Sequence, residues 1–313
     1  MTHPQALPLT RFTIGTRGSP LALAQARLTA SLMAESLGIA PGAITTSIIT
    51  TTGDATQDRP LSEIGGKGLF TKEIDIAQLE GRVDLAVHSS KDLPTVLPEG
   101  LVIAGYLPRE DVRDALIAPR HLTLANLPQG ARIGTVSLRR QALLRALRPD
   151  LNIEALRGNV QTRLDKAASG EFDAVMLAMA GLNRLGLAHH ATEALDPLRF
   201  IPAVGQGAIA LVIRAGDAAL QAAVQGIIHA PTGVELAAER VFLKELDGSC
   251  RTPIGGNARV MGESVAFRGV VLTPDGVEAE WVSGEAVPSE AEALGFEMAA
   301  RIKASRAFAK FRA

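Results

Sequence analysis

Short apolar segments alternate with amphipathic ones along most of this sequence, and this alternation is what most limits the fold. Strands are predicted at 12–16, 47–49 and 83–87, with helices between them at 20–37 and 69–79. Ser19 is placed as the N-cap of the first helix and Pro20 as its first residue. Strands separated by helices indicate a parallel sheet with helices on both faces. The first part of the chain therefore predicts a doubly wound α/β lobe.

The same order begins again after Asp114. Strands are predicted at 132–135, 151–155 and 173–178, with helices at 137–147 and 158–168 between them. The tripeptide Ile-Gly-Thr occurs at 14–16 and again at 133–135, each time before a serine and a helix. We therefore expect two similar lobes. A further apolar strand at 208–214 is expected to return to the first lobe.

The last third of the chain has a different character. A helix at 232–246 precedes a predicted antiparallel hairpin of 265–272 and 277–282, and a helix at 290–308 closes the chain. The fold class expected is α/β, with two doubly wound lobes and a small α+β C-terminal domain. The domains expected are 1–107 with 204–225, then the arginine-rich 108–203, then 226–313.

Composition limits the partners. The chain of 313 residues has a net charge of −1 and 4% aromatic residues, which argues against a basic or aromatic surface for nucleic acid and against a basic surface for membranes. It shows no targeting segment and no apolar run of the roughly 20 residues that span a bilayer. We expect a soluble cytoplasmic monomer that binds neither nucleic acid nor membrane.

Arginine is concentrated in the second lobe. Ten arginines and no lysine lie between Arg109 and Arg163. The guanidinium group grips carboxylate or phosphate at two points, so this pattern predicts a ligand with several anionic groups. The alternative is a solvated face whose arginines pair locally with acidic neighbours, namely Glu110, Asp111, Asp114 and Asp150.

Polar and basic residues gather where three predicted strands end. These clusters are 17–19, 88–92 and 137–140. Ligands of open parallel sheets bind beyond the carboxyl ends of the strands, where helix N-termini also present free N–H groups. The clusters therefore predict an anion site, although Asp92 could instead cap a helix or pair with Lys91. Glycine-rich 65–68 and 205–210 fail the nucleotide-binding patterns, and the histidines lack metal spacing, so neither nucleotide nor metal is expected.

The only cysteine, Cys250, lies in a loop of small and polar residues beside Arg251. A neighbouring arginine favours the nucleophilic thiolate, which makes Cys250 a candidate covalent attachment point. A lone cysteine can also be an inert core residue. A cysteine hydrolase would need a histidine base, and none lies near this loop. A non-catalytic anion-binding module would share the lobes but would not need the thiol.

Seven blocks together resemble the porphobilinogen deaminase family, also called hydroxymethylbilane synthase. The blocks lie at 16–23, 65–70, 88–94, 137–141, 156–160, 203–207 and 248–250. The resemblance implies two lobes like those of type II periplasmic binding proteins and a third domain. It also implies a transferase that joins four porphobilinogen molecules on a dipyrromethane cofactor, held by a thioether to Cys250, and releases linear hydroxymethylbilane for haem biosynthesis.

The resemblance also implies roles for individual residues. Asp92 would be the catalytic carboxylate. Cofactor and substrate would be bound by Arg17, Ser19, Lys67, Ser89, Lys91, Thr135, Ser137, Arg139, Arg140, Arg157, Arg163, Arg184 and Gln206. Two positions depart from the family pattern, because Thr52 stands where arginine is common and Glu63 where lysine is common. Both lie in the expected lid, whose cationic contribution is reduced to Lys67.

Overall fold

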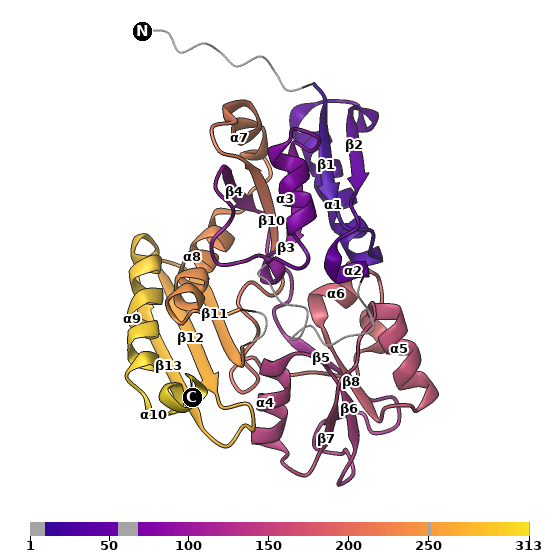
Figure 1. Cartoon of the computed structure of the whole chain (residues 1–313), viewed down its shortest axis with the longest axis vertical. Helices are drawn as coiled ribbons and strands as arrows, with labels where there is room; N and C mark the ends of the chain where they lie inside the picture. Colours follow the sequence, from indigo (N-terminus) through magenta and orange to yellow (C-terminus); the bar gives the residue numbers. More distant parts are fainter. Residues whose placement is uncertain (1–9, 56–67, 250–251, 313) are drawn as a thin grey trace. The chain divides into compact units, whose positions relative to one another are not determined.

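The computed structural model describes residues 10–55, 68–249 and 252–312 (Figure 1). The chain forms two compact units. The first consists of Met1–Arg109 and Ala208–Thr232, and the second of Glu110–Gly207 and Gly233–Ala313. The chain thus leaves the first unit and returns to it, as the apolar strand at 208–214 led us to expect. The predicted three-domain boundaries remain a prediction.

A five-stranded mixed sheet forms the centre of the first unit. Its strand order is β2-β1-β3-β10-β4, with bounds Ile44–Ile48, Phe12–Thr16, Leu85–Ser89, Ile209–Arg214 and Leu101–Tyr106. β1 runs parallel to β2 and β3, whereas β10 is antiparallel to β3 and β4. Ile14, Leu85 and Leu211 are fully buried in its core. The helices of this unit are α1 (Pro20–Leu37), α2 (Thr52–Ala55), α3 (Lys72–Leu79) and α7 (Ala218–Val224).

Helix α1 begins and ends where the sequence predicts. The Ser19 hydroxyl accepts a hydrogen bond from the Ala22 N–H at 3.3 Å, which satisfies one of the free donors of the first turn. Pro20 occupies the first helical position. Gly38 ends the helix with φ of +62°, a conformation that glycine adopts without a Cβ clash. These local signals fix the polar end of β1 against the start of α1.

The second unit contains a sheet with the same order and directions. The strands β7 (Asn152–Glu154), β6 (Arg132–Gly134), β8 (Ala174–Ala178), β5 (Asp114–Ile117) and β9 (Glu193–Ala194) lie side by side in that order. β5 takes the antiparallel place that β10 takes in the first sheet. The expectation of two similar lobes is confirmed. The expected parallel pairing is found for β1, β2 and β3 and for β6, β7 and β8, whereas β10 and β5 run antiparallel to their neighbours, which the expectation of parallel sheets did not include.

The C-terminal part of the second unit is the predicted α+β structure. β11 (Ile254–Met261), β12 (Ser264–Leu272) and β13 (Ala279–Ala286) form an antiparallel sheet that packs on α8 (Ala230–Glu245) and α9 (Ala291–Lys303). The final predicted helix is divided, since α10 (Arg306–Arg312) follows a break after α9. Val270 and Leu272 join Leu143 in the core of the second sheet. This shared core explains why both parts form one compact unit.

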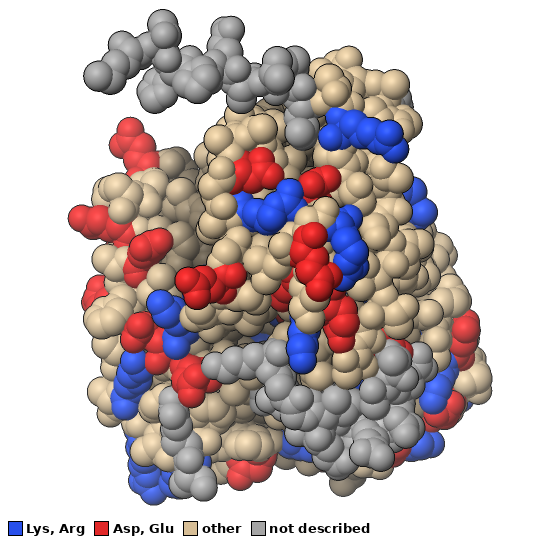
Figure 2. Space-filling view, turned by 45° about the horizontal axis from the view of Figure 1, so that its top comes forward, with Lys and Arg blue, Asp and Glu red and all other residues tan. Residues whose placement is uncertain are grey.

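The remaining helices of the second lobe are α4 (Leu138–Leu147), α5 (Val160–Ser169) and α6 (Met179–Arg184). Among the described residues, no helix has both the length and the apolar character needed to cross a bilayer. On the face shown in Figure 2, acidic and basic side chains of the described residues lie interspersed. This distribution agrees with the net charge of −1.

Helix α3 carries a buried carboxylate, that of Asp75. This residue is 4% exposed, and its Oδ1 has no hydrogen-bond partner among the described residues. Burial raises the pKa of Asp75 from its ordinary value of 3.8 to about 6; the Thr71 hydroxyl opposes this rise and Glu73 adds to it. The folded state therefore binds the acidic proton more tightly than the unfolded chain does.

This raised pKa predicts a pH-dependent stability that Asp75→Asn removes. The stabilising contribution of the protonated carboxyl is complete below about pH 4 and is lost as the pH rises through about 6. From pH 4 to pH 8, the free energy of unfolding of Asp75→Asn should rise relative to that of the parent by up to about 3 kcal/mol. Chemical denaturation measures this difference, with exposed Glu35→Gln as the control. A difference that does not change with pH would contradict the expectation.

Candidate active site

In the first unit, the predicted site residues follow the carboxyl ends of the adjacent parallel strands β1 and β3. Arg17 and Ser19 come directly after β1. Ser89 ends β3, and Lys91 and Asp92 lie in the short 3-10 helix Ser90–Asp92 that follows. The Arg17 Nη1 lies 3.8 Å from Asp92 Oδ2. The structure therefore brings together the catalytic candidate and a candidate anion-binding arginine, both partly exposed.

Arg17 is also held by a residue that the sequence did not single out. Its Nε and Nη2 donate to the two carboxylate oxygens of Asp54 at 3.1 and 2.5 Å. Burial lowers the pKa of Arg17, but Asp54 and Asp92 outweigh burial and leave it raised. Burial likewise raises the pKa of Asp54, and the hydrogen bonds from Arg17 and Thr51 bring it below its ordinary value. Both groups are therefore charged at neutral pH.

Two residues of β3 next to this cluster, His88 and Ser89, carry no charge at neutral pH. His88 in β3 is buried, and burial together with the charge of Arg17 lowers its pKa to about 4. Ser89 is oriented by buried Gln25 of α1, whose Nε2 donates to the Ser89 hydroxyl at 2.9 Å. At neutral pH, His88 therefore adds no positive charge near Arg17.

In the second unit, the predicted residues gather where β6 ends and α4 begins. The Ser137 hydroxyl accepts from the Arg140 N–H at 3.4 Å as the N-cap of α4, and the buried Thr135 hydroxyl accepts from the Ser137 N–H at 3.2 Å. This is the predicted strand-to-helix turn. It directs the first turn of α4, with Arg139 and Arg140, into the protein interior.

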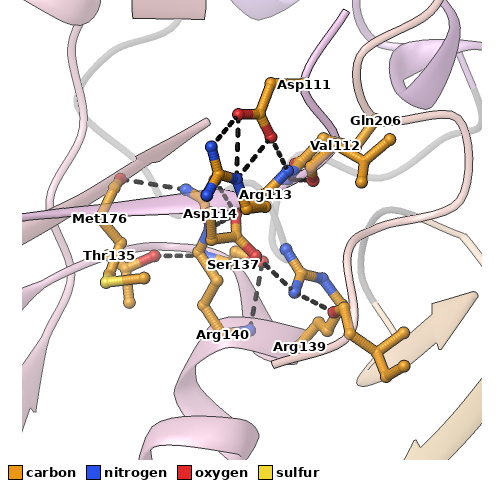
Figure 3. A network of polar contacts seen from close by, with 11 residues as sticks. Asp111, Val112, Arg113, Asp114, Thr135, Ser137, Arg139, Arg140, Met176 and Gln206 are labelled. Carbon is orange, nitrogen blue, oxygen red and sulfur yellow. Dashed lines mark hydrogen bonds and ion pairs between the residues drawn. The ribbon is translucent and has the colours of Figure 1, made fainter. Parts of the chain in front are cut away.

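Arg139 and Arg140 share one buried carboxylate (Figure 3). Arg139 Nη1 lies 2.8 Å from Asp114 Oδ2, and Arg140 Nη2 lies 2.6 Å from Asp114 Oδ1. Arg140 Nη1 also donates to the Met176 carbonyl at 3.0 Å, and Arg139 Nη1 to the Ile201 carbonyl at 2.5 Å. These two arginines therefore pair with an acidic residue, Asp114, but they do so in the protein interior and not on a solvated face.

Gln206 belongs to the same network. Its Nε2 donates to Asp114 Oδ1 at 3.1 Å and to the Val112 carbonyl at 2.8 Å. Burial of Asp114 raises its pKa, but the two arginines and Gln206 outweigh burial and bring the pKa far below its ordinary value. A second buried carboxylate, Glu239 of α8, accepts from the Gly205 N–H at 2.8 Å and fixes the turn that carries Gln206.

Arg157, Arg163 and Arg184 are half-buried in this unit. Arg163 Nε donates to the Gly158 carbonyl at 3.0 Å. Burial and the positive charges of Arg140 and Arg157 lower the pKa of Arg163 to about 10. Arg184 Nη2 donates to the Gly207 carbonyl at 2.6 Å, and burial lowers its pKa against the charge of Glu110. The positive charges of Arg163, Arg157 and Arg140, held close together, favour an anionic ligand.

Several sequence predictions concern residues that lie outside the described part. These are Lys67 and Glu63 of the expected lid and the attachment candidate Cys250. Thr52 is described, and its backbone N–H donates to Glu73 Oε1 at 3.1 Å while its hydroxyl bonds the same oxygen. The residue that departs from the family pattern therefore anchors α2 to α3.

Sequence reasoning missed Asp54, Asp114 and Glu239. The sequence suggests Asp114 only as a local partner in a solvated face, because its four-residue strand β5 gives no alternating pattern. Each of the three is an acidic residue that holds a predicted site residue or the turn next to one. Buried arginines need acidic partners, so the many arginines of this lobe indicate that some nearby acidic residue is buried with them. This signal could have identified Asp114.

Comparisons with known proteins agree on one family. Residues 12–222 match the family "Porphobilinogen deaminase, dipyromethane cofactor binding domain", and residues 234–304 match "Porphobilinogen deaminase, C-terminal domain". Curated porphobilinogen deaminases of Nitrobacter hamburgensis and Nitrobacter winogradskyi are each 54% identical to the chain over 299 residues. These matches cover 96% of this chain and 94% of each relative.

Solved structures give weaker likenesses. A lipoprotein of the YaeC family from Enterococcus faecalis matches with a TM-score of 0.41 and 15% identity over 70% of this chain and 92% of that one. A periplasmic binding protein of Salmonella typhimurium matches with a TM-score of 0.40 and 10% identity over 69% and 90%. At these scores neither likeness supports a conclusion about the chain.

The buried network predicts that Asp114→Asn strongly destabilises the protein. Removal of the carboxylate leaves two buried guanidinium groups without their counter-charge, which should lower the free energy of unfolding by about 3 to 5 kcal/mol. The control is Asp111→Asn, whose partner Arg113 has a side chain that is 44% exposed, and the loss of this pair should cost less than about 1 kcal/mol. Chemical denaturation compares the two. Equal losses would show that burial of the Asp114 network does not govern stability.

Proposed function

The chain belongs to the porphobilinogen deaminase family, and we propose that Asp92 is its catalytic carboxylate and that its arginines hold the carboxylates of its ligands. The protein is a transferase of tetrapyrrole biosynthesis that polymerises porphobilinogen into hydroxymethylbilane. Its cofactor is dipyrromethane. The observation that supports the assignment of residues is the meeting of Arg17 and Asp92 beyond the ends of β1 and β3.

The ligands are strongly acidic. Porphobilinogen is a pyrrole with an acetate and a propionate side chain, so each added ring brings two carboxylates. Guanidinium groups bind carboxylates at two points and stay charged, so arginine suits a ligand with many carboxylates better than lysine does. We propose that Arg17, Ser19, Ser89 and Lys91 act from the first unit, and Thr135, Ser137, Arg139, Arg140, Arg157, Arg163, Arg184 and Gln206 from the second. Lys67 is proposed for the same task.

The residues of the second unit fit an acidic cofactor. Arg139 Nε is buried and has no hydrogen-bond partner among the described residues, which leaves a donor for a ligand oxygen. Arg163 has arginines as its charged neighbours, and an anion would relieve their repulsion. Arg140 is different, since its guanidinium nitrogens already contact Asp114 and Met176. We infer that Arg140 supports the site chiefly by fixing Asp114.

Asp92 has the charge that the reaction requires. Loss of ammonia from porphobilinogen leaves a cationic pyrrole, and a carboxylate beside the pyrrole N–H stabilises that charge where water is partly excluded. The same carboxylate is placed to accept the proton that the new ring must lose. Arg17 Nη1 lies 3.8 Å from Asp92 Oδ2, so the carboxylate has a positive neighbour without a tight hydrogen bond to it.

When bound, the dipyrromethane cofactor supplies the primer that is extended. We propose that Cys250 holds it through a thioether, which the single thiol beside Arg251 supports. We further propose that the enzyme works as a monomer in the cytoplasm, where reducing conditions keep a thiol available.

Mass spectrometry tests the attachment and the oligomeric state together. The denatured parent should exceed its sequence mass by a two-pyrrole unit, and Cys250→Ala should show no excess and no activity. Native mass spectrometry should give the mass of one chain. An unmodified mass in active parent protein would refute the attachment, and a dimer would refute the monomer.

Asp92→Asn should separate catalysis from cofactor binding. The amide keeps the size of the side chain but removes the charge that opposes the cation, so turnover should fall at least about 100-fold while the mass excess stays. Single-turnover kinetics and intact mass measure these effects. Exposed Glu99→Gln in the same unit is the control and should keep normal turnover. Near-normal turnover in Asp92→Asn would remove this residue from the mechanism.

A further inference from the structure

Asp54 lies beside the site and pairs with Arg17. Both of its carboxylate oxygens accept from Arg17, at 3.1 and 2.5 Å, which is the strong two-point geometry of an arginine and a carboxylate. The third guanidinium nitrogen, Nη1, lies 3.8 Å from Asp92 Oδ2, beyond hydrogen-bond distance. Arg17 is therefore bound to one carboxylate and merely near the other.

Asp54 is itself fixed by Thr51. The buried Thr51 hydroxyl donates to Asp54 Oδ2 at 2.8 Å, and the Asp54 N–H donates to the Thr51 carbonyl at 3.0 Å. These contacts leave little freedom at the carboxylate. A flexible carboxylate would lose more conformational entropy on pairing with Arg17.

Helix α2, which carries Asp54, is anchored to the segment before α3. The Gly53 N–H donates to the Leu69 carbonyl at 2.9 Å, and Thr52 contacts Glu73. Gly53 has no room for a side chain, because a Cβ there would lie 2.3 Å from the Phe70 ring. That same ring stacks against Arg17, with its centroid 4.2 Å from the guanidinium carbon. The fold thus holds Arg17 from two sides.

We propose that Asp54 is a positioning residue that keeps Arg17 from closing onto Asp92, so that the Asp92 carboxylate remains available to the substrate. This inference rests on the catalytic role proposed for Asp92. Without Asp54, Asp92 is the carboxylate nearest to the guanidinium in this cluster. A shift of about 1 Å would turn the loose approach into a charge-assisted hydrogen bond. The Asp92 oxygens would then accept hydrogen bonds from Arg17 and would be less available to the substrate.

The proposal makes a prediction for the pH profile of turnover. The titratable groups around Arg17 are Asp54, Asp92 and buried His88, and Lys91 precedes Asp92 in the same 3-10 helix. Closure of Arg17 onto Asp92 stabilises the ionised carboxylate, so the acid limb of kcat should move down by about one pH unit in Asp54→Asn. At pH 8, kcat should fall by about 10- to 100-fold, as expected for a misplaced catalytic group.

Four variants test this. Asp54→Asn should show both effects with its cofactor mass intact, Thr51→Val should show smaller effects in the same direction, and Asp54→Glu should restore part of the turnover. The matched control is Asp84→Asn, which breaks another aspartate–arginine pair in the same unit, with Arg214 at 2.9 Å. This control should leave the acid limb in place. A fall in kcat with an unmoved acid limb in Asp54→Asn would overturn the proposal.

The double variant Asp54→Asn, Asp92→Asn distinguishes the two proposals. If Asp92 is catalytic and Asp54 acts through it, the added Asp54→Asn change should leave the residual turnover of Asp92→Asn within about twofold. A further loss equal to that of the single variant would show that Asp54 acts independently of Asp92. High turnover in Asp92→Asn alone would instead overturn the catalytic role proposed above.

Discussion

The buried carboxylate of Asp114 organises the arginine-rich lobe. It joins an antiparallel strand, β5, to the first turn of α4 through Arg139 and Arg140, and to the returning chain through Gln206. Two guanidinium groups cannot be taken out of water side by side without such a counter-charge. Because Ser137 caps the same helix turn, one interaction sets the position of several site residues at once.

Arginines of one lobe lie in two different electrostatic environments. Arg140 is neutralised in the interior by Asp114, whereas half-buried Arg163 keeps other arginines as its charged neighbours. Both kinds of arginine look alike in the sequence, since each follows a polar residue at a helix start. Only the distance to a carboxylate distinguishes the two environments, and that distance depends on contacts between residues remote in the chain.

Local signals made much of the fold predictable. Ser19 and Gly38 mark the two ends of α1, and Ser137 marks the start of α4. The repeated Ile-Gly-Thr indicated two similar sheets. The antiparallel places of β5 and β10 were not predictable, because pairing between distant strands leaves no local pattern. For the same reason, the sequence pointed to Arg17 and Asp92 but not to Asp54, whose contact with Arg17 depends on the docking of α2.

The place of β10 has a consequence for biosynthesis on the ribosome. This strand fills the gap between β3 and β4 but is encoded more than a hundred residues after β4 begins. The first sheet is therefore incomplete while the whole second sheet, from β5 to β9, emerges and can close. A nascent chain must keep the edges of β3 and β4 from pairing wrongly until residues 209–214 have left the exit tunnel.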